Sequence, residues 1–281
     1  MEKIINWWQH IPEHINPDIF RIGSFHLRYY GLMYIAGFAT VYFLALYRIK
    51  KEGYEYSPVL IQNYFIWAIP GLIVGARLGY VLFYDLGYFI RNPIEIFCPF
   101  EFSGGVRYTG IYGMSYHGGV AGIILVSIFF CRKYKINFWR FADFFSPLVP
   151  LGFTFGRIGN FINGELYGRA TDVPWGMYFP LDPGHRLRHP SQLYEALLEG
   201  LFLFLILWAI RKKRFFPGFH FSIYIILYGA ARFLVEFVRQ PDPHIGFVAG
   251  PFTLGQVLSG IMIICGVVIF VVLKGRRQYG D

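Results

Sequence analysis

Residues 156–169, GRIGNFINGELYGR, combine glycines and apolar side chains with cationic, amide and acidic groups. Arg157, Asn160 and Asn163 are spaced by three, so a helix would place them near one face. A charge within a membrane costs at least about 2.5 kcal/mol, so charges in such a stretch indicate a function. The alternative is helix packing through the small residues, with Arg157 paired to Glu165. We favour a ligand-binding site.

A second polar group follows helical spacing near residue 230. Tyr228, Arg232 and Glu236 are four residues apart, which stacks a phenol, a guanidinium and a carboxylate along one helix face. Glu236 can hold Arg232 in place and leave some of its donors free, although a plain intrahelical salt bridge is the alternative. Pro241 cannot continue the helix, so we expect the helix to end before it and to leave Arg239 outside the helix.

His117 is the third candidate, within the run SYHGG at residues 115–119. A histidine near its ordinary pKa of about 6.5 can accept a proton at neutral pH. An isolated interfacial histidine is more often structural, so this motif alone does not establish catalysis. The three cysteines have no ligand spacing, and we expect no metal and no cofactor.

Several smaller motifs allow both a structural and a functional interpretation. Tyr30 follows Arg28 and Tyr29 and could line a site or belong to an aromatic belt. Arg77 lies within Gly71-x3-Gly75-x3-Gly79, which is first a helix-packing pattern. Ser191, with Gln192 and Glu195 after it, is typical of a helix start rather than of a nucleophile.

The composition is typical of a helical membrane protein. Of the residues, 55% are hydrophobic and 15% charged, and the mean hydropathy is +0.43. The net charge of +9 comes largely from short clusters between apolar runs, so anionic lipid headgroups fit it better than nucleic acid does.

Apolar runs near the length of a membrane helix recur along the whole chain. We predict spans at about 26–47, 59–84, 118–131, 141–163, 193–210, 219–238 and 252–273. The fourth contains two prolines and several glycines, so we expect a broken or re-entrant helix. The first residues lack the pattern of a cleaved signal, and residues 4–11 are expected to lie in the membrane interface.

Basic clusters follow every second span and predict the orientation. They are Arg48/Lys50/Lys51, Arg132/Lys133/Lys135/Arg140, Arg211/Lys212/Lys213/Arg214 and Lys274/Arg276/Arg277. The positive-inside rule places them in the cytoplasm, with the N-terminus outside and the C-terminus inside. We therefore expect one polytopic, all-α membrane domain over 1–281. An interfacial segment, 1–25, and two outer loops, 85–117 and 164–192, would form a small periplasmic cap.

Apart from Lys3, every basic residue outside those clusters is an arginine. Arginine suits sites that hold phosphate or carboxylate, because its guanidinium presents planar, forked donors. Under the predicted topology the candidate residues all lie at the outer level of the membrane. A transporter would instead concentrate such groups near the midplane of repeated halves, and we find no internal repeat.

These motifs resemble the prolipoprotein diacylglyceryl transferase family over about residues 19–273. The similarity rests on the 156–169 run, YGLMY at 30–34, HGG at 117–119, HPSQLYE at 189–195 and RFLVEF at 232–237. Residues 85–114 contain a longer aromatic insertion than the family suggests.

The resemblance implies transfer of the diacylglyceryl group of phosphatidylglycerol to the lipobox cysteine of a prolipoprotein at the periplasmic face of a bacterial inner membrane. A thioether forms, glycerol phosphate leaves, and the substrate supplies the nucleophile. The implied catalytic residues are His117 as base, Tyr30 or Tyr228 in the proton path, and Arg157 and Arg232 as stabilisers of the leaving group. The implied phosphatidylglycerol-binding residues are Arg157, Asn160, Glu165, Gly168, Glu236 and Arg239.

Two other classes of function remain. A phospholipid transporter or scramblase would also use an arginine-rich outer site, and would move lipid without forming an adduct. A chaperone for signal peptides would bind the peptide without consuming lipid.

Overall fold

The computed structural model describes residues 2–22, 25–98, 100–101, 107–108, 113–241 and 246–278. It is mostly helical and divides into two compact units. The first unit contains residues 1–47 and 142–281, and the second contains residues 48–141. We describe each unit by itself.

The first unit carries most of the long helices. Its elements are α1 (Glu2–Gln9), α2 (Ile11–His14), β1 (Asp18–Ile22), β2 (Phe25–Arg28), α3 (Tyr29–Glu52, whose end enters the second unit), α8 (Val149–Ile162), α9 (Ser191–Glu195), the π-helical η2 (Ala196–Phe202), α10 (Leu203–Ile210), α11 (Phe219–Val235), β5 (Phe247–Ala249), β6 (Phe252–Thr253) and α12 (Leu254–Gln278). The strands form the antiparallel hairpins β1–β2 and β5–β6.

The second unit contains α4 (Pro58–Phe83), α5 (Leu86–Arg91), the 3-10 helix η1 (Pro93–Ile96), β3 (Phe100–Glu101), β4 (Arg107–Tyr108) and α6 (Tyr116–Lys133). Helix α7 (Phe138–Phe145) begins in this unit and ends in the first. Of the predicted outer loop 85–117, residues 99, 102–106 and 109–112 lie outside the described residues.

Four helical stretches of the described residues are long and apolar enough to cross a membrane. They are Tyr29–Glu52, Pro58–Phe83, Ser191–Ile210 and Leu254–Arg276. Helices also occupy the other predicted spans, but α8 and α11 have only 14 and 17 residues. The structure thus has the helices of a membrane protein, and the number of spans and their orientation remain predictions.

The fourth predicted span is interrupted, as its prolines indicated. Helix α7 ends at Phe145 and α8 begins at Val149 after a turn over residues 146–148. Pro150 lies in the first turn of α8, where the missing N–H group leaves no helical hydrogen bond unmade. The helix end that carries Arg157 is therefore a separate, short element.

Helices α4 and α6 of the second unit pack through glycines. A Cβ atom built on Gly75 would lie 2.6 Å from the carbonyl oxygen of Gly118 and 2.7 Å from Cα of Gly122. The close approach needs residues without side chains, which confirms the packing interpretation of the spaced glycines. The Tyr64 hydroxyl and Ser127 Oγ, 2.8 Å apart, add a buried polar contact between the same helices.

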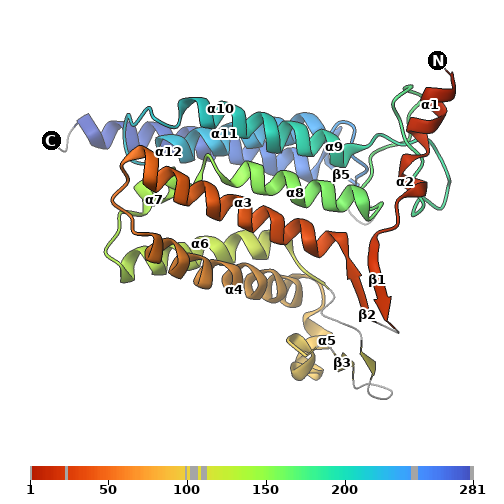
Figure 1. Cartoon of the computed structure of the whole chain (residues 1–281), viewed down its shortest axis with the longest axis horizontal. Coiled ribbons are helices and arrows are strands. Elements are labelled where there is room, and N and C mark those ends of the chain that lie inside the picture. Colours follow the sequence, from red (N-terminus) through yellow and green to blue (C-terminus); the bar gives the residue numbers. More distant parts are fainter. Residues whose placement is uncertain are drawn as a thin grey trace. The chain divides into compact units, whose positions relative to one another are not determined.

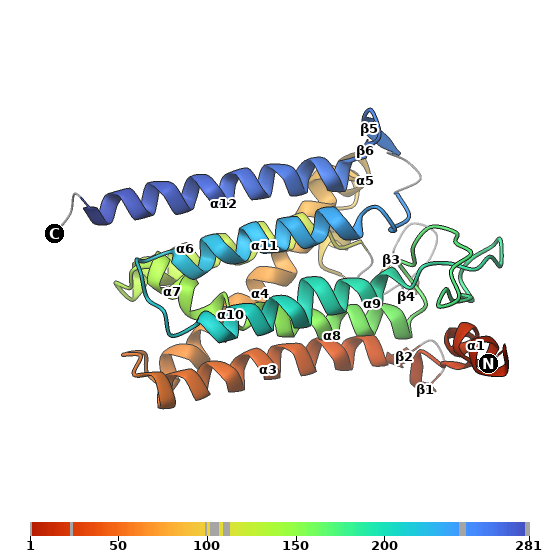
Figure 2. The same cartoon turned by 90° about the horizontal axis from the view of Figure 1, so that it is seen from above.

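The long helices of the first unit run side by side, with α11 between α12 and the α9–α10 run (Figures 1 and 2). Helix α8 packs against η2, and Gly200 of η2 leaves room for Thr154 of α8. It also contacts α3, because a Cβ atom on Gly37 would lie 2.9 Å from the carbonyl oxygen of Gly152. These contacts place α8 beside α3 and η2.

The N-terminal helices are attached to the 164–190 segment within the first unit. Trp8 Nε1 donates a hydrogen bond to the Trp175 carbonyl at 3.0 Å, and the Tyr178 amide donates to the Gln9 carbonyl at 2.8 Å. Ile4 remains 71% exposed on α1, which fits an interfacial segment. These two predicted outer parts therefore contact each other, and the periplasmic cap itself stays a prediction.

A buried ion pair between Arg188 and Asp182 joins two parts of the 164–190 segment. Arg188 donates to both carboxylate oxygens of Asp182, from Nε at 2.8 Å and from Nη2 at 2.7 Å. These hydrogen bonds hold the pKa of Asp182 well below its usual range. Arg188 Nη1 also donates to Gln240 at 3.2 Å, which links the segment to the chain after α11.

Candidate active site

The C-terminal half of α8 presents Arg157 and Asn160 on one face, as their spacing predicted. Arg157 Nη1 donates to the Asn160 Oδ1 at 3.4 Å, and Asn160 Nδ2 donates to Glu165 at 2.8 Å. Asn163 ends the helix as its C-cap and also donates to Glu165, at 3.4 Å. The polar side chains of the 156–169 run therefore form one connected chain from Arg157 to Glu165.

Arg157 pairs with Glu195 of α9, whereas the alternative interpretation of the 156–169 run had paired it with Glu165. Arg157 Nε lies 2.8 Å from Glu195 Oε2. The guanidinium carbon also lies 4.7 Å from the centre of the Phe153 ring, one turn earlier in α8. A carboxylate and an aromatic face thus fix the direction of the guanidinium.

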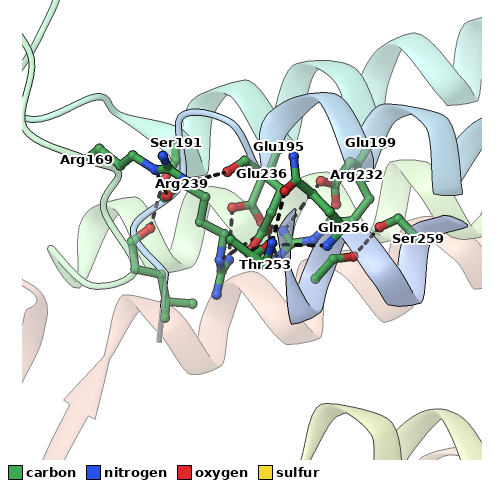
Figure 3. A network of polar contacts seen from close by, with 12 residues as sticks. Arg169, Ser191, Glu195, Glu199, Arg232, Glu236, Arg239, Thr253, Gln256 and Ser259 are labelled. Carbon is green, nitrogen blue, oxygen red and sulfur yellow. Dashed lines mark hydrogen bonds and ion pairs between the residues drawn. The ribbon is translucent and has the colours of Figure 1, made fainter. Parts of the chain in front are cut away.

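Glu195 is shared by three arginines. Arg232 Nη1 lies 3.3 Å from the same Oε2 atom that Arg157 contacts, and Arg239 Nη1 donates to Oε1 at 3.1 Å. Glu199, one turn along in η2, lies 3.6 Å from Arg232 Nη1. Figure 3 shows Glu195, Glu199, Arg232 and Arg239 gathered in one network.

The stacked residues of α11 contribute to the same network. Arg232 Nη2 lies 2.9 Å from Glu236 Oε2, which confirms the predicted contact between them. Thr253, just before α12, donates from Oγ1 to Glu236 Oε1 at 3.0 Å (Figure 3). The buried Tyr228 lies near enough to Arg157 and Arg232 to interact with both electrostatically.

Tyr30 reaches this region from the start of α3. Its ring packs on Gly159, because a Cβ atom there would lie 3.1 Å from the ring carbon Cδ2. The Tyr30 hydroxyl interacts with the Asn160 side chain and lies 3.0 Å from the Tyr34 hydroxyl. The structure therefore brings Tyr30 to the polar end of α8.

Gly168 lies at a backbone junction. Its amide donates to the His189 carbonyl at 2.8 Å, and its Cα approaches the Val238 carbonyl so closely that a Cβ atom would overlap it. The neighbouring Arg169 Nε donates to the Arg239 carbonyl at 2.9 Å. Gly168 thus lets the segment after α8 lie against the segment that carries Arg239.

The arginine side chains are partly exposed and the carboxylates behind them are buried. The exposed fractions are 14% for Arg157 and 16% for both Arg232 and Arg239, compared with 0% for Glu195 and Glu199. A molecule that approaches this cluster therefore meets arginine side chains before it meets the carboxylates. Forked, fixed guanidiniums are suited to a phosphate group.

His117 and Arg77 belong to the second unit. His117 lies in the first turn of α6, is exposed, and contacts the Tyr116 ring edge-on with centroids 5.7 Å apart. Arg77 donates to the carbonyl groups of Glu95 at 2.7 Å and Ile96 at 2.5 Å, and its side chain is buried. Arg77 therefore anchors the segment after α5, whereas the role of His117 stays a prediction.

Glu195 was predicted only as part of a helix start, and Glu199 was not predicted as a functional residue. Helix α9 does begin at Ser191, so that interpretation was confirmed. The signal that could have identified both acids is their position in an apolar run, four residues apart, where a buried charge needs a partner. Among the described residues, no group of three or more His, Cys, Asp or Glu is placed to bind a metal.

Comparisons with known proteins point to one family over almost the whole chain. A family model described as prolipoprotein diacylglyceryl transferase matches residues 17–272. A Chlorobaculum tepidum protein named phosphatidylglycerol–prolipoprotein diacylglyceryl transferase is 48% identical, with 100% of this chain and 98% of the relative covered. Proteins of that name from Campylobacter curvus and Geobacter sulfurreducens are each 45% identical, with 95% of this chain and 97% and 98% of the relatives covered.

Proposed function

The chain belongs to the prolipoprotein diacylglyceryl transferase family, and on that premise we propose that it transfers the sn-1,2-diacylglyceryl group of phosphatidylglycerol to the lipobox cysteine of prolipoproteins. It is a transferase of lipoprotein biosynthesis with helices suited to a membrane. The substrates and the chemistry are the proposed part.

The proposed reaction exchanges one bond to carbon for another. The cysteine sulfur forms a bond to the glyceryl carbon, and the bond from that carbon to the phosphate oxygen breaks. The electron pair stays on the oxygen, so glycerol phosphate leaves, and the thiol proton passes to a base. Fixed cations lower the barrier when they contact the oxygens on which this charge develops.

The arginine cluster is the observation that supports this chemistry most directly. Arg157, Arg232 and Arg239 converge on one buried carboxylate, and each keeps part of its side chain exposed. Such fixed guanidiniums can bind the phosphodiester before transfer and the phosphomonoester after it. We assign the leaving-group contact to Arg157 and Arg232, and a contact with phosphate or the signal region of the substrate to Arg239.

The remaining assignments follow from residue type and local contacts. Asn160 and Glu165 orient Arg157 and the glycerol headgroup, and Glu236 orients Arg232. His117 is the base that the sequence suggests, with Tyr30 or Tyr228 in the proton path. Gly168 shapes the headgroup site through the junction that it allows with the chain before Arg239.

We propose that residues 1–281 form a single domain with seven spans. The N-terminus would lie outside and the C-terminus in the cytoplasm of a bacterial inner membrane, with the reaction at the periplasmic face. The basic clusters between spans support this orientation. Cysteines introduced into the 164–192 segment should react with a membrane-impermeant thiol reagent in intact spheroplasts, and cysteines near Arg211 should not. The opposite pattern would overturn the orientation.

A reconstituted assay tests the function itself. Purified protein in phosphatidylglycerol vesicles should add a diacylglyceryl mass to a lipobox peptide, and a peptide with serine in place of the cysteine should gain none. Lipid movement between leaflets without an adduct would favour a scramblase. Peptide binding without lipid consumption would favour a chaperone.

A further inference from the structure

Glu195 is held in place because the start of its helix, α9, is hydrogen-bonded to the segment that follows α8. Ser191 Oγ donates to the Leu166 carbonyl at 2.9 Å, and Gln192 Nε2 donates to the Glu165 carbonyl at 2.6 Å. Both side chains are fully buried, so the start of α9 is tied to the segment that follows α8. Glu195 lies one turn further along and is directed at the arginines (Figure 3).

The contacts of Glu195 join three separate parts of the chain. Arg157 belongs to α8, Arg232 belongs to α11, and Arg239 follows α11. Two of these cations share Oε2 and the third binds Oε1. Guanidiniums brought this close repel one another, and the carboxylate between them offsets that repulsion at the required spacing.

The other two buried acids do not make this set of contacts. Glu199 Oε1 lies 3.6 Å from Arg232 Nη1. Glu236 pairs with Arg232 at 2.9 Å and lies 3.9 Å from Arg239 Nε. Of these three carboxylates, Glu195 is the one whose ion pairs include Arg157.

We infer that Glu195 is the positioning residue of the reaction, which sets the spacing and direction of the guanidiniums without itself contacting the lipid. This role rests on the proposed function. It predicts that binding and turnover respond differently when Glu195 is changed. Loss of its negative charge makes the cluster more attractive to an anionic headgroup, whereas loss of its geometry misplaces the groups that stabilise the leaving oxygen.

Glu195→Gln tests this inference, and Glu199→Gln is its matched control. Both changes remove one buried carboxylate from the same helical run, but only the first releases Arg157 and Arg239. The assay uses full-length protein, phosphatidylglycerol vesicles and a lipobox peptide, and phosphatidylglycerol affinity is measured without peptide by native mass spectrometry. Thermal unfolding in detergent shows whether each variant is folded.

For Glu195→Gln we expect kcat to fall by about 100-fold while phosphatidylglycerol binds as tightly as to the wild type or more tightly. For Glu199→Gln we expect a fall in kcat of less than about tenfold. Glu195→Asp keeps the charge on a shorter side chain, so it should fold even if the glutamine variant does not. Its loss of kcat should lie between those of Glu195→Gln and Glu199→Gln.

Three results would overturn the inference. One is unchanged kcat in a folded Glu195 variant, and another is an equal loss in Glu199→Gln, which would make charge alone responsible. The third is a parallel loss of lipid affinity and kcat in a folded Glu195→Gln, which would make Glu195 a binding group. If the wild type forms no thioether product, the proposed function itself fails, and the positioning role with it.

Discussion

Replacement of Arg157 by lysine separates the charge of this residue from its geometry. The arginine pairs with Glu195 through Nε at 2.8 Å, donates to Asn160 through Nη1 at 3.4 Å, and lies on the Phe153 ring. A lysine ammonium is one point charge and cannot hold all of these contacts at once. Arg157→Lys therefore keeps the cation but loses the fixed direction of its donors.

The expected size of the effect follows from the number of oriented donors that are lost. Removal of one preorganised donor to a developing oxyanion costs about 2.7 to 4 kcal/mol, which corresponds to a fall of about 10²- to 10³-fold in kcat. Because the charge remains, the affinity for phosphatidylglycerol should change by less than about tenfold, or 1.4 kcal/mol. Arg157→Ala should weaken both binding and turnover.

The assay is single-turnover transfer to a lipobox peptide, with product measured by mass spectrometry, together with phosphatidylglycerol titration. Arg211→Lys is the control, because Arg211 ends α10 and contacts Trp208 rather than the arginine cluster. A folded Arg157→Lys protein with a single-turnover rate constant within about threefold of the wild type would refute the argument that oriented donors at Arg157 stabilise the leaving group.

Three further predictions concern other parts of the chain. Gly75→Ala should lower the free energy of unfolding by about 1 to 3 kcal/mol because its new methyl group meets backbone atoms, whereas Gly260→Ala in α12 should not lower it because, among the described residues, nothing outside its own helix backbone lies within 4 Å of the new methyl group; denaturation in detergent compares them. Asp182→Asn should lower the free energy of unfolding at pH 7 by about 3 kcal/mol. Because Arg188 lowers the pKa of Asp182, its stabilisation is present above about pH 4 and lost as the pH falls further, so wild type and variant should converge in acid; a constant difference would contradict this. His117→Gln should reduce transfer by about 10²-fold or more at pH 7. Transfer by this variant should rise toward about pH 8.5, because the substrate thiol then ionises without a base. A loss of the same size at every pH would argue against His117 as the base.

Local sequence patterns predicted the features that depend on neighbouring residues. The apolar runs predicted where helices lie, and the prolines of the fourth run predicted its interruption before Val149. Helical spacing predicted the contact of Arg232 with Glu236 and that of Arg157 with Asn160. In each case the periodicity of the helix alone brings the two side chains together.

Contacts between distant segments were beyond these patterns. No spacing in the sequence relates Glu195 to Arg157 or Arg239, because their proximity depends on how α8, α9 and α11 pack. The same holds for Asp143, whose carboxylate accepts hydrogen bonds from the Gly218 amide at 2.7 Å and the Phe221 amide at 2.9 Å at the start of α11. Buried acids need partners as much as buried arginines do, and this requirement is the one sequence signal that points to Glu195 and Glu199.

A structure of the protein with bound phosphatidylglycerol would test the central claim most directly. We expect phosphate oxygens within about 2.7 to 3.2 Å of guanidinium nitrogens of both Arg157 and Arg232. A lipid phosphate bound away from these side chains, with the arginines still paired to Glu195 and Glu236 as they are here, would contradict it.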